Sequence, residues 1–178
     1  MGQKYEDSES GGFFCYTCSM NSSTAILVVA ESRLAEANAL HRAGYYEGAI
    51  YLTGYGLELI LKAKICQRLD IPNLFDDGFV QSTGRQVMGM DFRVGAEFRK
   101  FYLVHDIAKL LLLTGLQGRF LADREADTSG QLTKAWTDIV EAKWSEEFRY
   151  LAAGTKTADE SLAFSEAVNQ IKTWILIT

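Results

Sequence analysis

Apolar residues recur at helical spacing from residue 23 onward, which makes helix the main structural prediction for this chain. The first amphipathic segment begins at Ser23 or Thr24, whose hydroxyl groups can cap a helix, and ends at Gly44, which suits the residue just past a helix end. Its apolar positions are Ile26, Val29, Ala30, Leu34, Ala37 and Leu40. Polar side chains lie between them, so one face of this helix should be buried.

The next segment, Tyr46–Leu69, is apolar on nearly every side. A helix of this kind lies in the middle of a bundle, because it offers no polar face to water. Gly54 and Gly56 interrupt the segment, each at a cost of about 1 kcal/mol relative to alanine. We expect a neighbouring helix to approach closely there. Asp70 and Pro72 should then end the helix.

Three further helices are predicted in the second half of the chain. They are His105–Leu116, a segment from the capping-box pattern Thr128-x-x-Gln131 to about Lys143, and a segment from the capping box Thr157-x-x-Glu160 to Ile177. No stretch alternates apolar and polar residues for long enough to predict a strand. The predicted fold class is therefore all-α, an up-and-down bundle of about five helices.

The segments outside these helices divide the chain. Residues 1–22 are rich in Gly and Ser and are predicted to be a flexible leader, so the helical domain should span residues 23–178. Residues 70–103 form an irregular insertion between the second and third helices. A segment of this length without regular structure is unusual in a compact domain, so we expect it to be functional or to be ordered by something else.

Composition and charge limit the number of domains and the kinds of partner that this chain is expected to have. The 178 residues suit one domain, and the 23 acidic and 18 basic residues give a net charge of −5, which disfavours broad attraction to nucleic acid or to anionic membranes. The longest uncharged apolar runs, such as Leu110–Leu113, fall far short of the roughly 20 residues of a membrane span. The N-terminus lacks the basic and apolar regions of a signal peptide. We therefore expect a cytoplasmic protein that does not bind membranes.

The three cysteines do not suggest a disulfide framework. Cys15 and Cys18 form a lone C-x-x-C in the leader, without a second pair or a histidine couple to complete a zinc site. We interpret them as incidental thiols, with an intermolecular metal site or disulfide as the alternative. Cys66 lies in an apolar helical stretch and should be a small core residue. Dinucleotide, P-loop, zincin and serine-hydrolase motifs are missing from the sequence, so we predict no cofactor and no metal.

Glu58 stands out because it lies midway along the most apolar helix. An unpaired buried carboxylate costs several kcal/mol. A pair with Lys62, one helical turn away, or a bridge to an arginine would satisfy it, and Arg149 is the arginine we favour. The alternative is a carboxylate that lines a ligand site or a subunit interface. Arg149 and its neighbour Tyr150 join Glu58 and Lys62 as candidate ligand-binding or interface residues.

His105 is one of two histidines in the chain and begins an apolar helix beside Asp106. It is either a bridging residue at a helix start, or a general acid–base or phosphate contact. In the insertion before it, Arg93, Arg99 and Lys100 lie among aromatic residues, a composition typical of surfaces that bind single-stranded nucleic acid. Packing of a loop edge on the bundle would explain the same composition.

Three stretches in order resemble the HEPN domain, a helical bundle of prokaryotic defence and toxin–antitoxin systems. The most specific runs from Ala37 to Ala63 and includes A-G-Y-Y-E-G-A-I-Y and G-L-E-L-I-L-K-A. The others are H-D-I-A-K-L-L from His105, and Trp144 with Arg149-Tyr150 before a last helix. The resemblance covers roughly residues 24–177 and is strongest to the subgroup often paired with a minimal nucleotidyltransferase.

The resemblance implies a bundle of four or five helices, usually dimeric, that binds RNA or nucleotides or partners a nucleotidyltransferase. Many members are metal-independent RNases with an R-x4–6-H motif, and Arg99 and His105 have five residues between them. The chain departs from the family here, because Lys100 follows the arginine where the family has a polar Asn, Asp or His, and because the family's motif lies on a late helix.

The leading functional hypothesis is therefore a nucleotide- or RNA-associated accessory module in a defence or toxin–antitoxin setting, in which Glu58, His105 and Arg149 line or brace a groove between helices. An RNase that uses Arg99 and His105 and a structural protein-interaction module are the alternatives. The ten Phe, eight Tyr and three Trp agree with a homodimer. The stretch around Gly44 is also similar to one tetratricopeptide unit, but no second unit follows at a spacing of about 34 residues.

Overall fold

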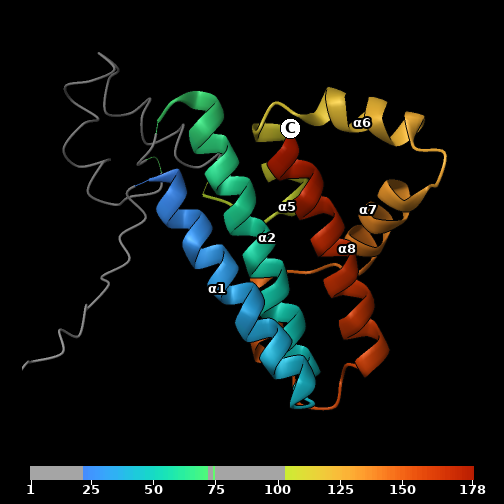
Figure 1. Ribbon diagram of the computed structural model, residues 1–178. Coiled ribbons are helices and arrows are strands. Elements are labelled where there is room, and N and C mark those ends of the chain that lie inside the picture. The colour runs from blue at the N-terminus through green and yellow to red at the C-terminus, as the bar shows by residue number, and fades with distance from the viewer. Residues whose placement is uncertain (1–21, 72–73, 75–102) are drawn as a thin grey trace, which may run out of the picture.

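The computed structural model describes residues 22–71, 74 and 103–178, which form six α-helices and one 3₁₀ helix and contain no strand. Labelled as in Figure 1, these are α1 (Ser23–Arg42), α2 (Tyr46–Leu69), α5 (Ile107–Leu113), α6 (Gln117–Ala126), α7 (Gln131–Glu141), η1 (Glu146–Tyr150) and α8 (Ala158–Ile177). The all-α prediction is confirmed. None of the helices in the described ranges is long and apolar enough to cross a membrane.

Several sequence predictions concern residues outside the described ranges. They are the leader of residues 1–22 except Ser22, with Cys15 and Cys18, and most of the insertion, with Pro72, Arg93, Arg99 and Lys100. The described residues do not test these predictions.

α2 is the central helix of the bundle, and its predicted bounds are confirmed. Figure 1 shows α1 on one side of it and α8 on the other, and α2 also contacts α5 and η1. Because it is covered from several directions, fifteen of its 24 residues are buried. Cys66 is one of them, as expected for a core residue, and burial raises the pKa of its thiol to about 11. The helix ends where Asp70 adopts a left-handed conformation, with φ of 55°.

The two glycines of α2 lie where neighbours approach most closely. A β-carbon on Gly56 would be 2.6 Å from Cδ2 of Leu34, which lies on α1. A β-carbon on Gly54 would be 2.3 Å from the indole ring of Trp144. The prediction of a close helix is therefore confirmed at Gly56, whereas Gly54 makes room for a side chain that follows α7.

The ends of α1 follow the predicted chemistry with a shift of one residue at the start. The cap is Ser22, whose Oγ accepts a hydrogen bond from the backbone N–H of Ala25 at 3.1 Å. The prediction of Ser23 or Thr24 was wrong by that shift. Gly44 follows the last turn with φ of 82°, a conformation that suits glycine, and it allows α2 to fold back along α1.

The third predicted helix, His105–Leu116, is shorter than expected. Asp106 caps α5 through a hydrogen bond from the backbone N–H of Lys109 to Oδ1, at 3.0 Å, and the chain turns at Gly115 with φ of 71°. α6 then follows, a helix that the hydrophobic pattern did not predict. Its only buried residue is Phe120, so this segment of the sequence lacks apolar residues at helical spacing.

One of the two predicted capping boxes forms. At Thr157 the hydroxyl accepts from the backbone N–H of Glu160, and the Glu160 carboxylate accepts from the backbone N–H of Thr157. The prediction of a capping box at Thr128 was wrong, because no such box forms there. α7 begins after Gly130 without a side-chain cap of that kind, and Oδ2 of Asp127 accepts from the backbone N–H of Leu132 instead.

Candidate functional site

Glu58, Lys62 and His105 form one polar cluster inside the bundle. Glu58 is fully buried on α2, and Lys62 lies one turn later with its Nζ 2.6 Å from Oε1 of Glu58. His105 approaches from the segment before α5, with Nδ1 2.9 Å from Oε2 and 3.1 Å from Oε1. The predicted pair of Glu58 with Lys62 is confirmed. The direct contact of Glu58 with His105 was not predicted, although both residues were expected to line or brace the same groove.

The cluster determines how His105 presents its ring. An ionised carboxylate can only accept hydrogen bonds, so the Nδ1 atom that faces Glu58 carries a hydrogen. Nε2 is then the nitrogen that can accept a proton or a hydrogen bond from another molecule. The side chain of His105 is 47% exposed, so this ring is held by a buried carboxylate while part of it remains open to solvent.

His105 lines a cleft of about 570 Å³ between the start of α5 and the second half of α7. Volumes of 300–1,000 Å³ are typical of sites for small ligands. The apolar part of the lining includes Ile107 from α5, and Trp136 and Ile139 from α7. The cleft therefore combines an apolar wall with one histidine that a buried carboxylate orients.

Two tryptophans of the cleft are fixed by contacts behind them. Trp144 is 8% exposed, and its Nε1 donates to the backbone oxygen of Tyr51 at 3.2 Å. Trp136 packs edge-on against Phe120, with ring centroids 5.0 Å apart. Side chains held in this way can offer a ring surface to a ligand without losing much conformational entropy.

Charged side chains of both signs line the same cleft. Asp106 caps α5 through its carboxylate, which also lies 3.5 Å from the ammonium group of Lys109. The charges of Asp106 and Lys109 therefore partly neutralise each other. Lys143 follows the last turn of α7 in a left-handed conformation, with φ of 49°, and makes no ion pair among the described residues. Glu146 is the other acidic residue of the lining. Lys143 is therefore the cation most available to an anionic ligand.

Arg149 and Tyr150 are not part of this site. Both are exposed at the end of η1, and the guanidinium carbon of Arg149 lies 5.0 Å from the centroid of the Tyr150 ring. The predicted bridge between Arg149 and Glu58 was wrong, because Glu58 is buried against α5 and is satisfied by Lys62 and His105. The structure thus brings together three of the predicted residues and leaves two on the surface.

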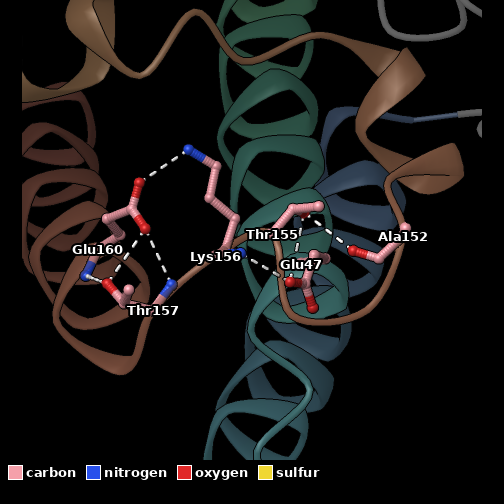
Figure 2. Close-up of polar contacts among 6 residues, drawn as sticks. All are labelled: Glu47, Ala152, Thr155, Lys156, Thr157 and Glu160. Carbon is pink, nitrogen blue, oxygen red and sulfur yellow. Dashed lines mark hydrogen bonds and ion pairs between the residues drawn. The ribbon is translucent and has the colours of Figure 1, made fainter.

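A second polar cluster lies where the loop before α8 meets the start of α2 (Figure 2). Glu47 is 8% exposed, and its Oε1 accepts from the backbone N–H of Lys156 at 2.8 Å and from the hydroxyl of Thr155 at 3.4 Å. Hydrogen bonds from its own backbone N–H and from that of Lys156 lower the pKa of Glu47. Lys156 also pairs with Glu160 at 2.9 Å. We interpret this cluster as a structural anchor of the loop.

The sequence did not identify Lys109, Trp136 or Lys143 as site residues. Trp136 follows the apolar spacing of α7, which predicts a core residue but not the edge of a cleft. Lys143 has a left-handed backbone conformation, which is not typical of lysine, so the sequence did not predict it. Among the described residues, no three His, Cys, Asp or Glu side chains are grouped so that they could hold a metal ion.

Comparison of the chain with protein-family models, with curated proteins and with solved structures finds no significant match. The similarity to the HEPN domain thus stays a prediction that rests on the sequence stretches described above.

Proposed function

We propose that this protein is a nucleotide- or RNA-associated binding module and that the cleft between α5 and α7 holds the ligand. One observation carries the proposal. His105, oriented by the buried carboxylate of Glu58, lines the same cleft as Trp136 and Lys143. The resemblance to the HEPN domain agrees with this assignment.

The chemistry of the cleft suits a nucleotide better than a purely apolar molecule. A tryptophan ring can stack on any of the nucleic-acid bases, and such stacking contributes about 1–3 kcal/mol per base. Lys143 can bind a phosphate group, and Nε2 of His105 can accept a hydrogen bond from the sugar or the base. The volume of about 570 Å³ would hold one nucleotide rather than a folded RNA.

Binding can be measured by calorimetry with nucleoside monophosphates and with a short single-stranded RNA. We expect Lys143→Gln and His105→Ala to weaken binding about tenfold, which corresponds to about 1.4 kcal/mol. Matched controls are Lys134→Gln, which removes the same charge from the exposed side of α7, and His41→Ala, which removes the other histidine. Equal effects of the control variants, or binding by none of these ligands, would rule out the cleft as the site.

A metal-independent RNase is the second candidate function, and the hydrogen bond from Nδ1 of His105 to Glu58 favours it. A carboxylate behind Nδ1 holds Nε2 ready to take or give a proton, as a general acid–base requires. Arg99 would stabilise the charge that develops on the phosphate. Incubation of RNA with the protein in EDTA, beside His105→Ala and His41→Ala, tests this. Cleavage that survives in His105→Ala would exclude the mechanism.

The proposed setting follows the resemblance: a cytoplasmic homodimer in a prokaryotic defence or toxin–antitoxin system, with a minimal nucleotidyltransferase as a possible partner. Light scattering across micromolar concentrations tests the dimer, and a monomer mass throughout would contradict it. Copurification with a nucleotidyltransferase tests the partner. A stable protein complex, together with no binding of nucleotide or RNA, would replace the proposal with a structural interaction module.

A further inference from the structure

A group of three cations lies at the opposite end of α5 from the cleft. Lys64 and Arg68 are one helical turn apart on α2, and Arg119 lies in the first turn of α6. The guanidinium of Arg68 reaches the turn between α5 and α6, where its Nη2 lies 3.9 Å from the position of a β-carbon on Gly115. Figure 1 places the last turns of α2 and the start of α6 at the same end of the bundle.

The positive charge of this group is poorly compensated by the described residues. Neither Lys64 nor Arg68 forms an ion pair with a carboxylate there. Arg119 has one acidic partner, with its Nε 3.4 Å from Oδ2 of Asp123, and that oxygen also accepts from Nε1 of Trp174 at 2.8 Å. Partial burial, and then the charges of Arg68 and Arg119, lower the pKa of Lys64.

Like charges held near one another repel, and in a chain of net charge −5 such a group is not a consequence of general basicity. A bound anion would relieve the repulsion. Guanidinium and ammonium groups both donate charge-assisted hydrogen bonds to the oxygens of a phosphate, and here α2 contributes one of each while α6 contributes a second guanidinium.

We propose that Lys64, Arg68 and Arg119 form a binding site for a phosphate group, separate from the cleft of His105. The group is either a free phosphate or a phosphodiester of a single-stranded nucleic acid, because both offer the same oxygens. The cations of the site come from α2 and α6, so the site does not depend on any residue of the proposed nucleotide cleft.

The test uses the full chain labelled with ¹⁵N and titrated with sodium phosphate at constant ionic strength. We expect the backbone amide signals of Lys64–Leu69 and Gln117–Phe120 to shift in a saturable way. Arg68→Gln, an exposed change, should weaken this binding about tenfold, and Lys134→Gln, with the same loss of charge on α7, should leave it unchanged. A shift that sodium chloride reproduces, or an equal loss in both variants, would overturn the proposal.

A second titration with a short single-stranded oligonucleotide distinguishes the two sources of the phosphate group. Tighter binding of the oligonucleotide, with the same loss in Arg68→Gln, identifies a phosphodiester. Binding of inorganic phosphate alone identifies a free phosphate. No response of these amides to either ligand overturns the proposal. His105→Ala should respond as the unaltered protein does, so failure of the cleft and failure of this site are distinguishable.

Discussion

The indole ring of Trp144 occupies the place where a β-carbon of Gly54 would lie. The distance from that position to Nε1 and to Cε2 of the ring is 2.3 Å. The ring is held there by the hydrogen bond from its Nε1 to the backbone oxygen of Tyr51. Because Trp144 also lines the cleft, a glycine in the central helix makes room for a wall of the candidate site.

We expect Gly54→Ala to lower the free energy of unfolding by about 2 kcal/mol. The added methyl group must displace a ring that is 8% exposed, and overpacking of this kind costs about 1–3 kcal/mol. Urea denaturation measures the change. Gly118→Ala on α6 is the control, since nothing lies within 4 Å of its β-carbon position and alanine favours helix. A Gly54→Ala protein as stable as the original would contradict the packing at Trp144.

Glu58 should contribute more to stability than His105, although they share a hydrogen bond. Glu58→Ala takes one buried partner from Lys62, and breaking a buried ion pair costs about 3–5 kcal/mol. His105→Ala should cost about 1 kcal/mol, because its side chain is 47% exposed and the carboxylate keeps its bond to Lys62. Thermal and urea unfolding of the two variants would show this order. Equal losses would mean that His105 is the main support of the carboxylate.

The sequence predicted the central helix and its buried carboxylate, because both depend on composition within one segment. Tyr46–Leu69 is apolar around its whole circumference, and Glu58 and Lys62 are neighbours by helical spacing alone. The contact between Glu58 and His105 joins residues 47 positions apart. It depends on how α5 packs against α2, which no local pattern encodes.

The same limit explains the errors at Arg149 and in α6. Arg149 was expected to neutralise Glu58 because it was an arginine beside aromatic residues, but it is exposed in η1. α6 packs through a single buried side chain, Phe120, against the rings of Trp136 and Trp174. A helix with one buried side chain has no periodic apolar face, so hydrophobic periodicity does not detect it.

The two predicted capping boxes allow a matched test of local sequence signals. Thr157→Ala should lower the free energy of unfolding by about 1 kcal/mol, because it removes the hydroxyl that accepts from the backbone N–H of Glu160. Thr128→Ala should change it by less than about 0.5 kcal/mol, because Thr128 is exposed and does not cap α7. Chemical denaturation measures both. A loss at Thr128 that matches the loss at Thr157 would show that α7 begins with the predicted box after all.

The anchor at Glu47 should make stability depend on pH in the acid range. Its pKa is lowered in the folded protein, chiefly by hydrogen bonds from backbone N–H groups, while the ordinary value of 4.5 applies to the unfolded chain. A carboxyl group with a lower folded pKa stabilises the protein above the unfolded value. That contribution is lost as the pH falls below 4.5 toward the folded pKa.

Glu47→Gln separates the charge from the shape, because glutamine keeps an acceptor oxygen but cannot ionise. We expect this variant to be less stable than the original protein by about 1 kcal/mol at pH 7, and the difference to shrink as the pH is lowered from 5 toward 3. Glu125→Gln, an exposed change on α6, should show no such trend. Urea titrations at several pH values measure both differences. A difference at Glu47 that stays constant with pH would mean that the loop before α8 is held by the shape of the side chain and not by its charge.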